Sequence, residues 1–146
     1  MGKINIGLLV LGGVVAGVAL FIVDAVVNGV FLVQEWNETM AALQKPTITE
    51  GMGNFVFFAF ISLIVGLTTM WVYVGIRPRF GAGPKTAIYA GLAVWVAAYL
   101  VPDAFVSQVG LVPARIAWVG IIVGFFQVPV ATILGAYLYQ EEPTAT

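Results

Sequence analysis

The sequence contains no cysteine and no histidine, and each absence removes a kind of chemistry. Without cysteine there is no disulfide, no thiolate nucleophile and no thiolate metal site. Without histidine the chain lacks the commonest zinc and haem ligand and the usual general base near neutral pH. The sequence therefore predicts a protein that is not an enzyme and that holds no cofactor and no metal.

Charge is also scarce, because charged residues make up 9% of the 146 residues and hydrophobic residues 61%. A soluble domain carries roughly a quarter charged residues, so lipid is the solvent that suits this composition. The formal net charge of −1 suggests neither nucleic-acid binding nor electrostatic docking onto anionic membranes. We expect an integral membrane protein whose main partner is the lipid bilayer and which binds no nucleic acid.

Long apolar segments are the main feature that is present. A bilayer core of about 30 Å is crossed by about 20 helical residues. Segments of this kind cover residues 4–33, 54–76, 86–101 and 116–139. We expect Pro102 to end the third segment, because a proline steers the residue before it away from helix. The prediction is a single all-α transmembrane domain over residues 1–146, an antiparallel four-helix bundle.

Basic residues gather on one side of this predicted bundle. The turn after the second span carries Arg77, Arg79 and Lys85 without an acid, and Lys3 falls on the same side. Basic residues favour the cytoplasmic side, so the pattern predicts that both termini lie in the cytoplasm.

The connections on the opposite side include a long loop, residues 34–53. Within it, residues 36–44 are expected to form a short helix on the membrane surface, with Pro46 beyond its end. In the later loop, Asp103 and Arg115 are expected to form an ion pair.

One face of the first span carries both small and polar residues. Gly13 and Gly17 form a small-xxx-small pair that lets a second helix approach closely, and Asp24 and Asn28 continue the same stripe. An ionisable group inside a bilayer is costly and commonly binds an ion or proton. A full span of apolar residues precedes Asp24, however, so its position favours a structural role at the outer interface.

Gln127 lies about halfway along the fourth span, where an unpaired amide is costly. Pro129 follows it and frees a backbone carbonyl near the same depth. A polar, kinked midpoint can form a substrate site. The favoured interpretation is an interhelical hydrogen bond, for which Ser62, Thr68 and Thr69 are candidate partners, and a packing kink.

The basic turn is the last candidate site. Arg77, Arg79, Lys85 and the predicted helix N-terminus beside them could hold a phosphate, most simply that of a lipid headgroup. A role in setting membrane topology explains the same charges and is favoured.

Residues 76–86, IRPRFGAGPKT, closely resemble a motif of small bacterial membrane proteins of unknown function. The resemblance includes residues 28–30 and the GAYLY segment at 135–139. It implies a protein of about this length in the bacterial inner membrane, without a known activity. Other four-span families fit poorly. Quinone-reducing epoxide reductases need cysteines, eicosanoid and glutathione enzymes carry an Arg/Glu-rich constellation, and small multidrug exporters place a glutamate well inside the first span.

The leading functional hypothesis is a non-catalytic membrane protein that acts by association. It would be a homo-oligomer or an accessory subunit of a larger inner-membrane complex, held through the face with Gly13 and Gly17 and through the apolar second span. The alternative is a small transporter or channel that uses Asp24, Asn28 and Gln127. A weaker alternative is the binding of a lipid or another hydrophobic ligand between the helices.

Overall fold

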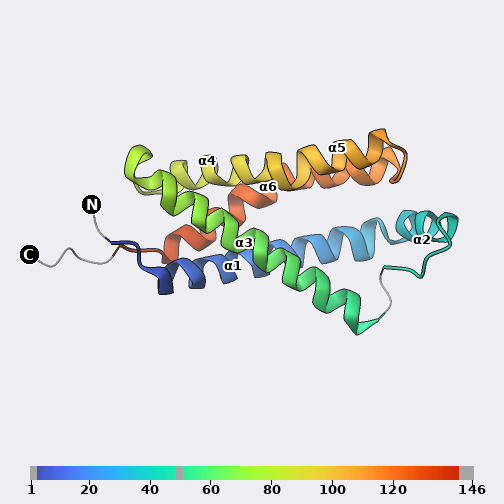
Figure 1. Ribbon diagram of the computed structural model, residues 1–146, viewed down its shortest axis with the longest axis horizontal. Helices are drawn as coiled ribbons and strands as arrows, with labels where there is room; N and C mark the ends of the chain where they lie inside the picture. Colours follow the sequence, from blue (N-terminus) through green and yellow to red (C-terminus); the bar gives the residue numbers. More distant parts are fainter. Residues whose placement is uncertain (1–2, 49–50, 142–146) are drawn as a thin grey trace, which may run out of the picture.

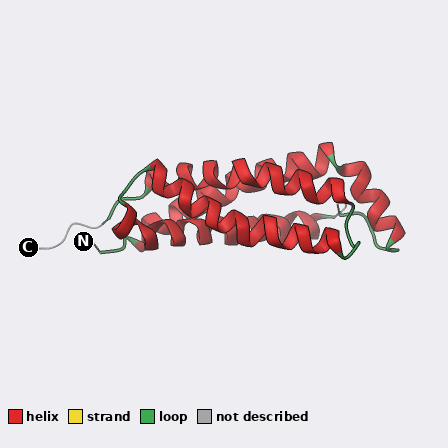
Figure 2. Cartoon of the chain, turned by 90° about the horizontal axis from the view of Figure 1, so that it is seen from above, coloured by secondary structure: helices red, strands yellow, loops and turns green. Residues whose placement is uncertain are grey.

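The described residues form four helical spans, each long and apolar enough to cross a membrane, that run in alternating directions (Figure 1). The computed structural model describes residues 3–48 and 51–141. Seen from above, the spans share one long axis (Figure 2). The predicted all-α, antiparallel four-helix bundle is confirmed. The elements are α1 (Ile6–Val26), η1 (Val27–Phe31), α2 (Val33–Ala42), α3 (Met52–Phe80), α4 (Pro84–Trp95), η2 (Val96–Leu100), α5 (Val101–Gln108) and α6 (Ala114–Leu138).

The third span does not end at Pro102, so that expectation is wrong. The helix continues to Gln108, and a π-helical turn, η2, ends at Leu100, two residues before the proline. Proline removes a backbone donor and its ring crowds the carbonyl of the residue four positions earlier. The wider π turn relieves this crowding, and the N–H of Val101 donates to the carbonyl of Val96.

The short helix expected in the first external loop is α2, which begins and ends slightly earlier than residues 36–44. The indole N–H of Trp36 donates to the side-chain oxygen of Asn28 at 2.9 Å, which ties α2 to the end of the first span. Arg115 forms an ion pair with Glu35 of α2. The expected pairing of Arg115 with Asp103 is therefore corrected, since α2 folds back towards the start of α6.

Glycines bring α1 and α3 into backbone contact. A Cβ built on Gly13 would lie 2.8 Å from the Cα of Leu67, and one on Gly17 would lie 2.7 Å from the Cα of Leu63. A Cβ on Gly66 would overlap the backbone of both α1 glycines. The face with Gly13 and Gly17 is thus a helix-packing face within one chain. It is not free for a second subunit, which corrects the expectation that association uses it.

The last span is the most buried of the four. Half of the most apolar window of α6 is buried (50%), compared with 22% for α3. A Cβ on Gly12 of α1 would lie 2.7 Å from the carbonyl oxygen of Gly135, and one on Gly91 of α4 would lie 2.6 Å from the Cα of Pro129. These contacts hold α1 and α4 on α6.

The start of α1, the end of α6 and the α3–α4 turn lie at one end of the bundle, and α2 lies at the other (Figure 1). We call these the terminus end and the α2 end. Lys3, Arg77, Arg79 and Lys85 belong to segments at the terminus end. The clustering of basic residues predicted from the sequence is therefore present in three dimensions.

Replacing Gly66 with alanine should lower the free energy of unfolding by about 1–3 kcal/mol, because the added methyl group meets backbone rather than a movable side chain. The control is Gly75→Ala in the same helix, where a Cβ meets nothing within 4 Å. Unfolding in mild detergent followed by circular dichroism measures the difference. Equal stability of the two variants would contradict the close approach of α1 and α3.

Candidate functional site

Three polar side chains from three spans meet between the helices. The side-chain N–H of Gln127 on α6 donates to Oδ1 of Asp24 on α1 at 2.7 Å. The hydroxyl of Tyr99 in η2 donates to Oδ2 of Asp24 at 3.0 Å. Gln127 Nε2 also lies 3.2 Å from the Tyr99 oxygen, as a second donor contact. We call these three residues the Asp24 cluster.

Packing between the third span and α6 sets the position of Tyr99. A Cβ on Gly124 would lie 2.8 Å from Cδ1 of Tyr99, so only glycine leaves room for the ring. One turn earlier, the indole N–H of Trp95 donates to the carbonyl of Ile121 at 2.9 Å. The Tyr99 ring and the Trp95 indole together hold the π turn against α6. The Tyr99 hydroxyl therefore points to Asp24.

The structure brings together two of the three predicted polar residues. Asp24 and Gln127 are in direct contact and share one depth, whereas their sequence positions had placed them at different depths. The amide of Asn28 donates to the backbone carbonyl of Asp24 at 3.0 Å and its oxygen accepts from Trp36, so Asn28 does not reach the carboxylate.

The expected partners of Gln127 on α3 are not its partners. Thr68 and Thr69 donate to carbonyls of their own helix, those of Ile64 and Gly66, each at 2.8 Å. Ser62 is buried on the face of α3 that packs on Gly17, since the Ser62 carbonyl lies near that glycine. Threonine hydroxyls in a helix commonly bond to a carbonyl of their own helix in this way. The partners of the Gln127 amide are therefore on α1 and in η2.

Sequence reasoning missed Tyr99 and the position of Asp103. Asp103 follows Tyr99 by one helical turn, and its Oδ2 would lie 2.7 Å from a Cβ on Gly120 of α6. The spacing of four residues was the available signal, because it places both side chains on one helix face. It was obscured by the expectation that the helix ends at Pro102.

The charge of the Asp24 cluster is not offset by a basic side chain. Among the described residues, the ion pairs are Arg77 with Glu141 and Arg115 with Glu35. Gln127 is only 8% exposed, and its side-chain oxygen has no hydrogen-bond partner in the described chain. A carboxylate and an unsatisfied acceptor thus lie together, an arrangement that a bound proton or other positive group would complete.

The basic turn is engaged with its own chain. Arg77 lies 3.4 Å from the carboxylate of Glu141 and 5.1 Å from the centre of the Tyr139 ring. Lys85 lies over the ring of Tyr89 at 5.9 Å. No contact of Arg79 supports the predicted phosphate site in the described part of the chain.

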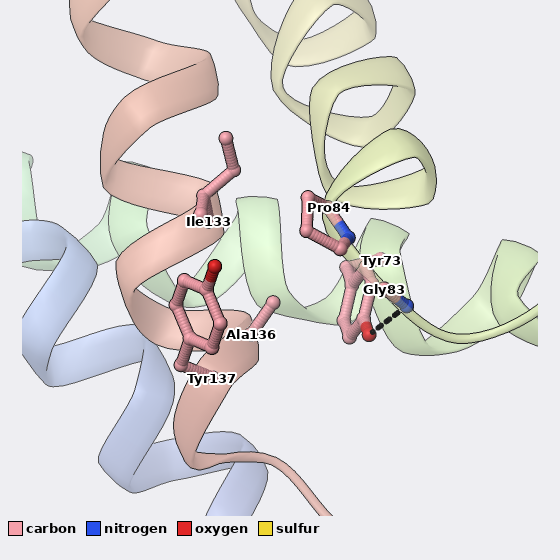
Figure 3. A pocket seen from close by; sticks show the side chains of 6 residues that line it. All are labelled: Tyr73, Gly83, Pro84, Ile133, Ala136 and Tyr137. Carbon is pink, nitrogen blue, oxygen red and sulfur yellow. Dashed lines mark hydrogen bonds between the residues drawn. The ribbon is translucent and has the colours of Figure 1, made fainter.

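A cavity of about 50 Å³ beside this turn has room for little more than water (Figure 3). The hydroxyl of Tyr73 points to the backbone N–H of Gly83 there and accepts a hydrogen bond from it at 3.3 Å. A larger apolar groove of about 310 Å³ lies between α3 and α4. It is lined by Ile64, Val65, Thr68, Val72, Ala93, Val94, Ala97 and Ala98.

No protein-family model, curated protein or solved structure matches the chain. The Asp24 cluster is therefore interpreted from its own geometry. Within residues 3–48 and 51–141, no group of three or more acidic side chains comes together as a metal site would require.

Replacing Tyr99 with phenylalanine should reduce stability by about 0.6–1.7 kcal/mol, because one hydrogen bond to Asp24 is lost inside the bundle. In an Asp24→Leu background the same replacement should cost much less, since the acceptor is gone. Unfolding of the four proteins of this double-mutant cycle in detergent measures the coupling. Tyr89→Phe, on the same span but 43% exposed, is the control. Equal costs of Tyr99→Phe in both backgrounds would show that the hydrogen bond contributes nothing.

Proposed function

We propose that this chain is a non-catalytic membrane protein that binds and releases a proton at Asp24, as part of a small proton-dependent transporter or channel. The observation that carries the proposal is the Asp24 carboxylate, held between three spans by donors from Tyr99 and Gln127 without a basic partner. The absence of cysteine and histidine supports the non-catalytic part.

The energetics favour a carboxylate that changes its protonation state. An ionised acid at the centre of a membrane helix costs about 2.5–3.5 kcal/mol on insertion scales. An interhelical hydrogen bond returns about 0.6 kcal/mol on average, so two such bonds do not offset the charge. Binding of a proton removes the charge altogether.

The unsatisfied oxygen of Gln127 gives the protonated state a partner. With Asp24 ionised, the amide N–H groups face the carboxylate, as in the structure. With Asp24 protonated, its O–H can donate to Gln127 Oε1 once the amide turns over, because the two ends of an amide have the same shape and opposite hydrogen-bonding roles. The cluster thus offers hydrogen bonds to both forms of the acid.

A proton suits the site better than a divalent metal ion. Magnesium and calcium take six or more oxygen ligands, waters included. The Asp24 cluster offers the two carboxylate oxygens, one hydroxyl and one amide oxygen. Each carboxylate oxygen already accepts a hydrogen bond, one from Gln127 and one from Tyr99.

For the location we propose the bacterial inner membrane, with the terminus end in the cytoplasm. The basic residues of that end, Lys3, Arg77, Arg79 and Lys85, support this orientation. The resemblance of residues 76–86 to small bacterial four-span proteins points the same way.

Infrared difference spectroscopy of the protein in liposomes, between acidic and alkaline buffers, tests the proposal without knowledge of a transported solute. We expect a protonated-carboxyl band in the wild type that Asp24→Asn removes. Glu38→Gln, which changes an exposed acid of α2, is the control and should retain it. An identical carboxyl spectrum for the wild type and Asp24→Asn would refute proton binding at Asp24.

A second candidate function, association with another copy of the chain or with a larger complex, is favoured by α3. Four consecutive residues near its start, Phe55, Val56, Phe57 and Phe58, are 57%, 57%, 58% and 44% exposed. Four consecutive helical residues point in all directions around the axis, so the rest of the chain covers no side of this segment fully.

Association through α3 predicts a homo-oligomer in mild detergent, larger than the chain mass of 15.5 kDa. Phe57→Ser should shift it to the monomer, because the exchange removes apolar contact area at the centre of the exposed segment. Phe126→Ser on α6, where the side chain is 65% exposed, is the matched control. Light scattering coupled to size exclusion measures the mass, and a wild-type monomer would argue against self-association.

A further inference from the structure

We infer that protons reach Asp24 from the α2 end only, through Asp103, while apolar side chains close the terminus end. The inference rests on the proposed proton binding at Asp24 and adds the side and the path. In the step itself, a hydronium ion on the α2 side gives its proton to the Asp103 carboxylate and leaves as water, and Asp103 then passes the proton to the Asp24 carboxylate. One O–H bond breaks as another forms, and Asp103 is ionised again.

Polar groups continue from the Asp24 cluster towards the α2 end. Asn28 lies one turn beyond Asp24, and its oxygen accepts from the Trp36 indole of α2. On the third span, Asp103 lies one turn beyond Tyr99 and is partly exposed. Polar side chains therefore extend outward from the cluster along two spans.

Gly120 places Asp103 in the same seam as the cluster. The Asp103 carboxylate occupies the space beside the Gly120 backbone, where a Cβ would lie 2.7 Å from Oδ2. Gly120 and Gln127 are seven residues apart on α6 and share one helix face, as Asp103 and Tyr99 do on the third span. The acid thus lies between the third span and α6, two turns of α6 outward from the amide of Gln127.

The terminus side of the cluster is closed. Ala16 and Leu20 of α1 and Val128 of α6 are fully buried, and they pack with Val94 and Ala131, which are 6% and 2% exposed. The nearest polar side chain beyond Gln127 on α6, Thr132, donates to the carbonyl of Val128 at 2.7 Å. This apolar seal offers a proton no chain of hydrogen-bonding side chains.

Few other titratable groups face the cluster. The third span contributes Tyr99 and Asp103, and α1 contributes only Asp24. On α6, Arg115 pairs with Glu35 at the α2 end, and between Arg115 and Tyr137 the helix carries no titratable side chain. The one titratable residue of α3 between Met52 and Ile76 is Tyr73, which bonds to Gly83 at the terminus end. Asp103 is therefore the only acid positioned to relay a proton to Asp24 among the described residues.

Because the natural sequence has no cysteine, a single introduced cysteine is the only thiol in each variant. Its reaction with a thiol reagent reports from which side of the membrane that position is accessible. The variants are Asn28→Cys and Asp103→Cys for the path, and Leu20→Cys and Ala131→Cys for the apolar seal. A charged, membrane-impermeant methanethiosulfonate is added to either side of oriented proteoliposomes. Lys85→Cys and Leu43→Cys mark the terminus and α2 sides.

We expect Asn28→Cys and Asp103→Cys to react from the α2 side only, and Leu20→Cys and Ala131→Cys to react from neither side. Reaction of the seal positions from the terminus side would overturn the inference. Failure of both path positions to react from the α2 side would also overturn it.

A kinetic measurement separates the relay from the proton site itself. After a pH jump on the α2 side, Asp103→Asn and Gly120→Ala should slow the rise of the Asp24 infrared band while leaving its final size unchanged. Gly75→Ala, which adds a methyl group in open space, should leave the rate unchanged. Unchanged rates in Asp103→Asn and Gly120→Ala would overturn the relay. Absence of the Asp24 band in the wild type would overturn proton binding at Asp24, and the relay with it.

Discussion

Close backbone contact between helices is the constraint on which the rest of the structure depends. Lipid gives helices no hydrophobic reason to associate, so packing at short range and polar contacts must hold the bundle together. Glycines allow this close approach where Gly66 meets Gly13 and Gly17. They also allow it where Gly12 meets Gly135. Because α1 is fixed between α3 and α6 in this way, Asp24 is carried to the depth of Gln127.

The Asp24 cluster follows from this packing but is not needed for it. Glycine contacts already hold α1 on α6, and Gly91 on Pro129 holds α4 on α6. Leucine in place of Asp24 alone would leave the donors of Tyr99 and Gln127 without their acceptor, which is costly. Apolar residues in place of all three members of the cluster would avoid both this cost and that of an acid in the membrane, and such joint exchanges are often neutral or stabilising. Stability alone therefore gives no reason for a carboxylate there. A group whose charge can be switched by a proton gives one.

The sequence predicted the number, approximate position and alternating directions of the spans, because the length of an apolar segment reports directly on the thickness of the bilayer. It could not predict which faces meet. The spacing of Gly13 and Gly17 indicates a close helix contact, but the same spacing serves a contact within one chain or between two. The shared depth of Asp24 and Gln127 was missed because counting residues along each span ignores how far each helix is offset and tilted. Tyr99 was overlooked because its position depends on a π turn close to Pro102, where the sequence predicted that the helix ends.

The two halves of the bundle differ in a way that suits access from one side. Towards the terminus end, buried apolar residues fill the space between α1, α4 and α6. Towards the α2 end, α3 diverges from α5 and α6 (Figure 1), and Phe55, Val56, Phe57 and Phe58 near the start of α3 are exposed. The π turn η2 lies at the boundary and carries Tyr99. Such turns are common at functional sites, and here the turn separates α4, held on Pro129 by Gly91, from α5, whose Asp103 rests on Gly120. Asp103 therefore lies on the α2 side of the Asp24 cluster, and the apolar seal lies on the opposite side.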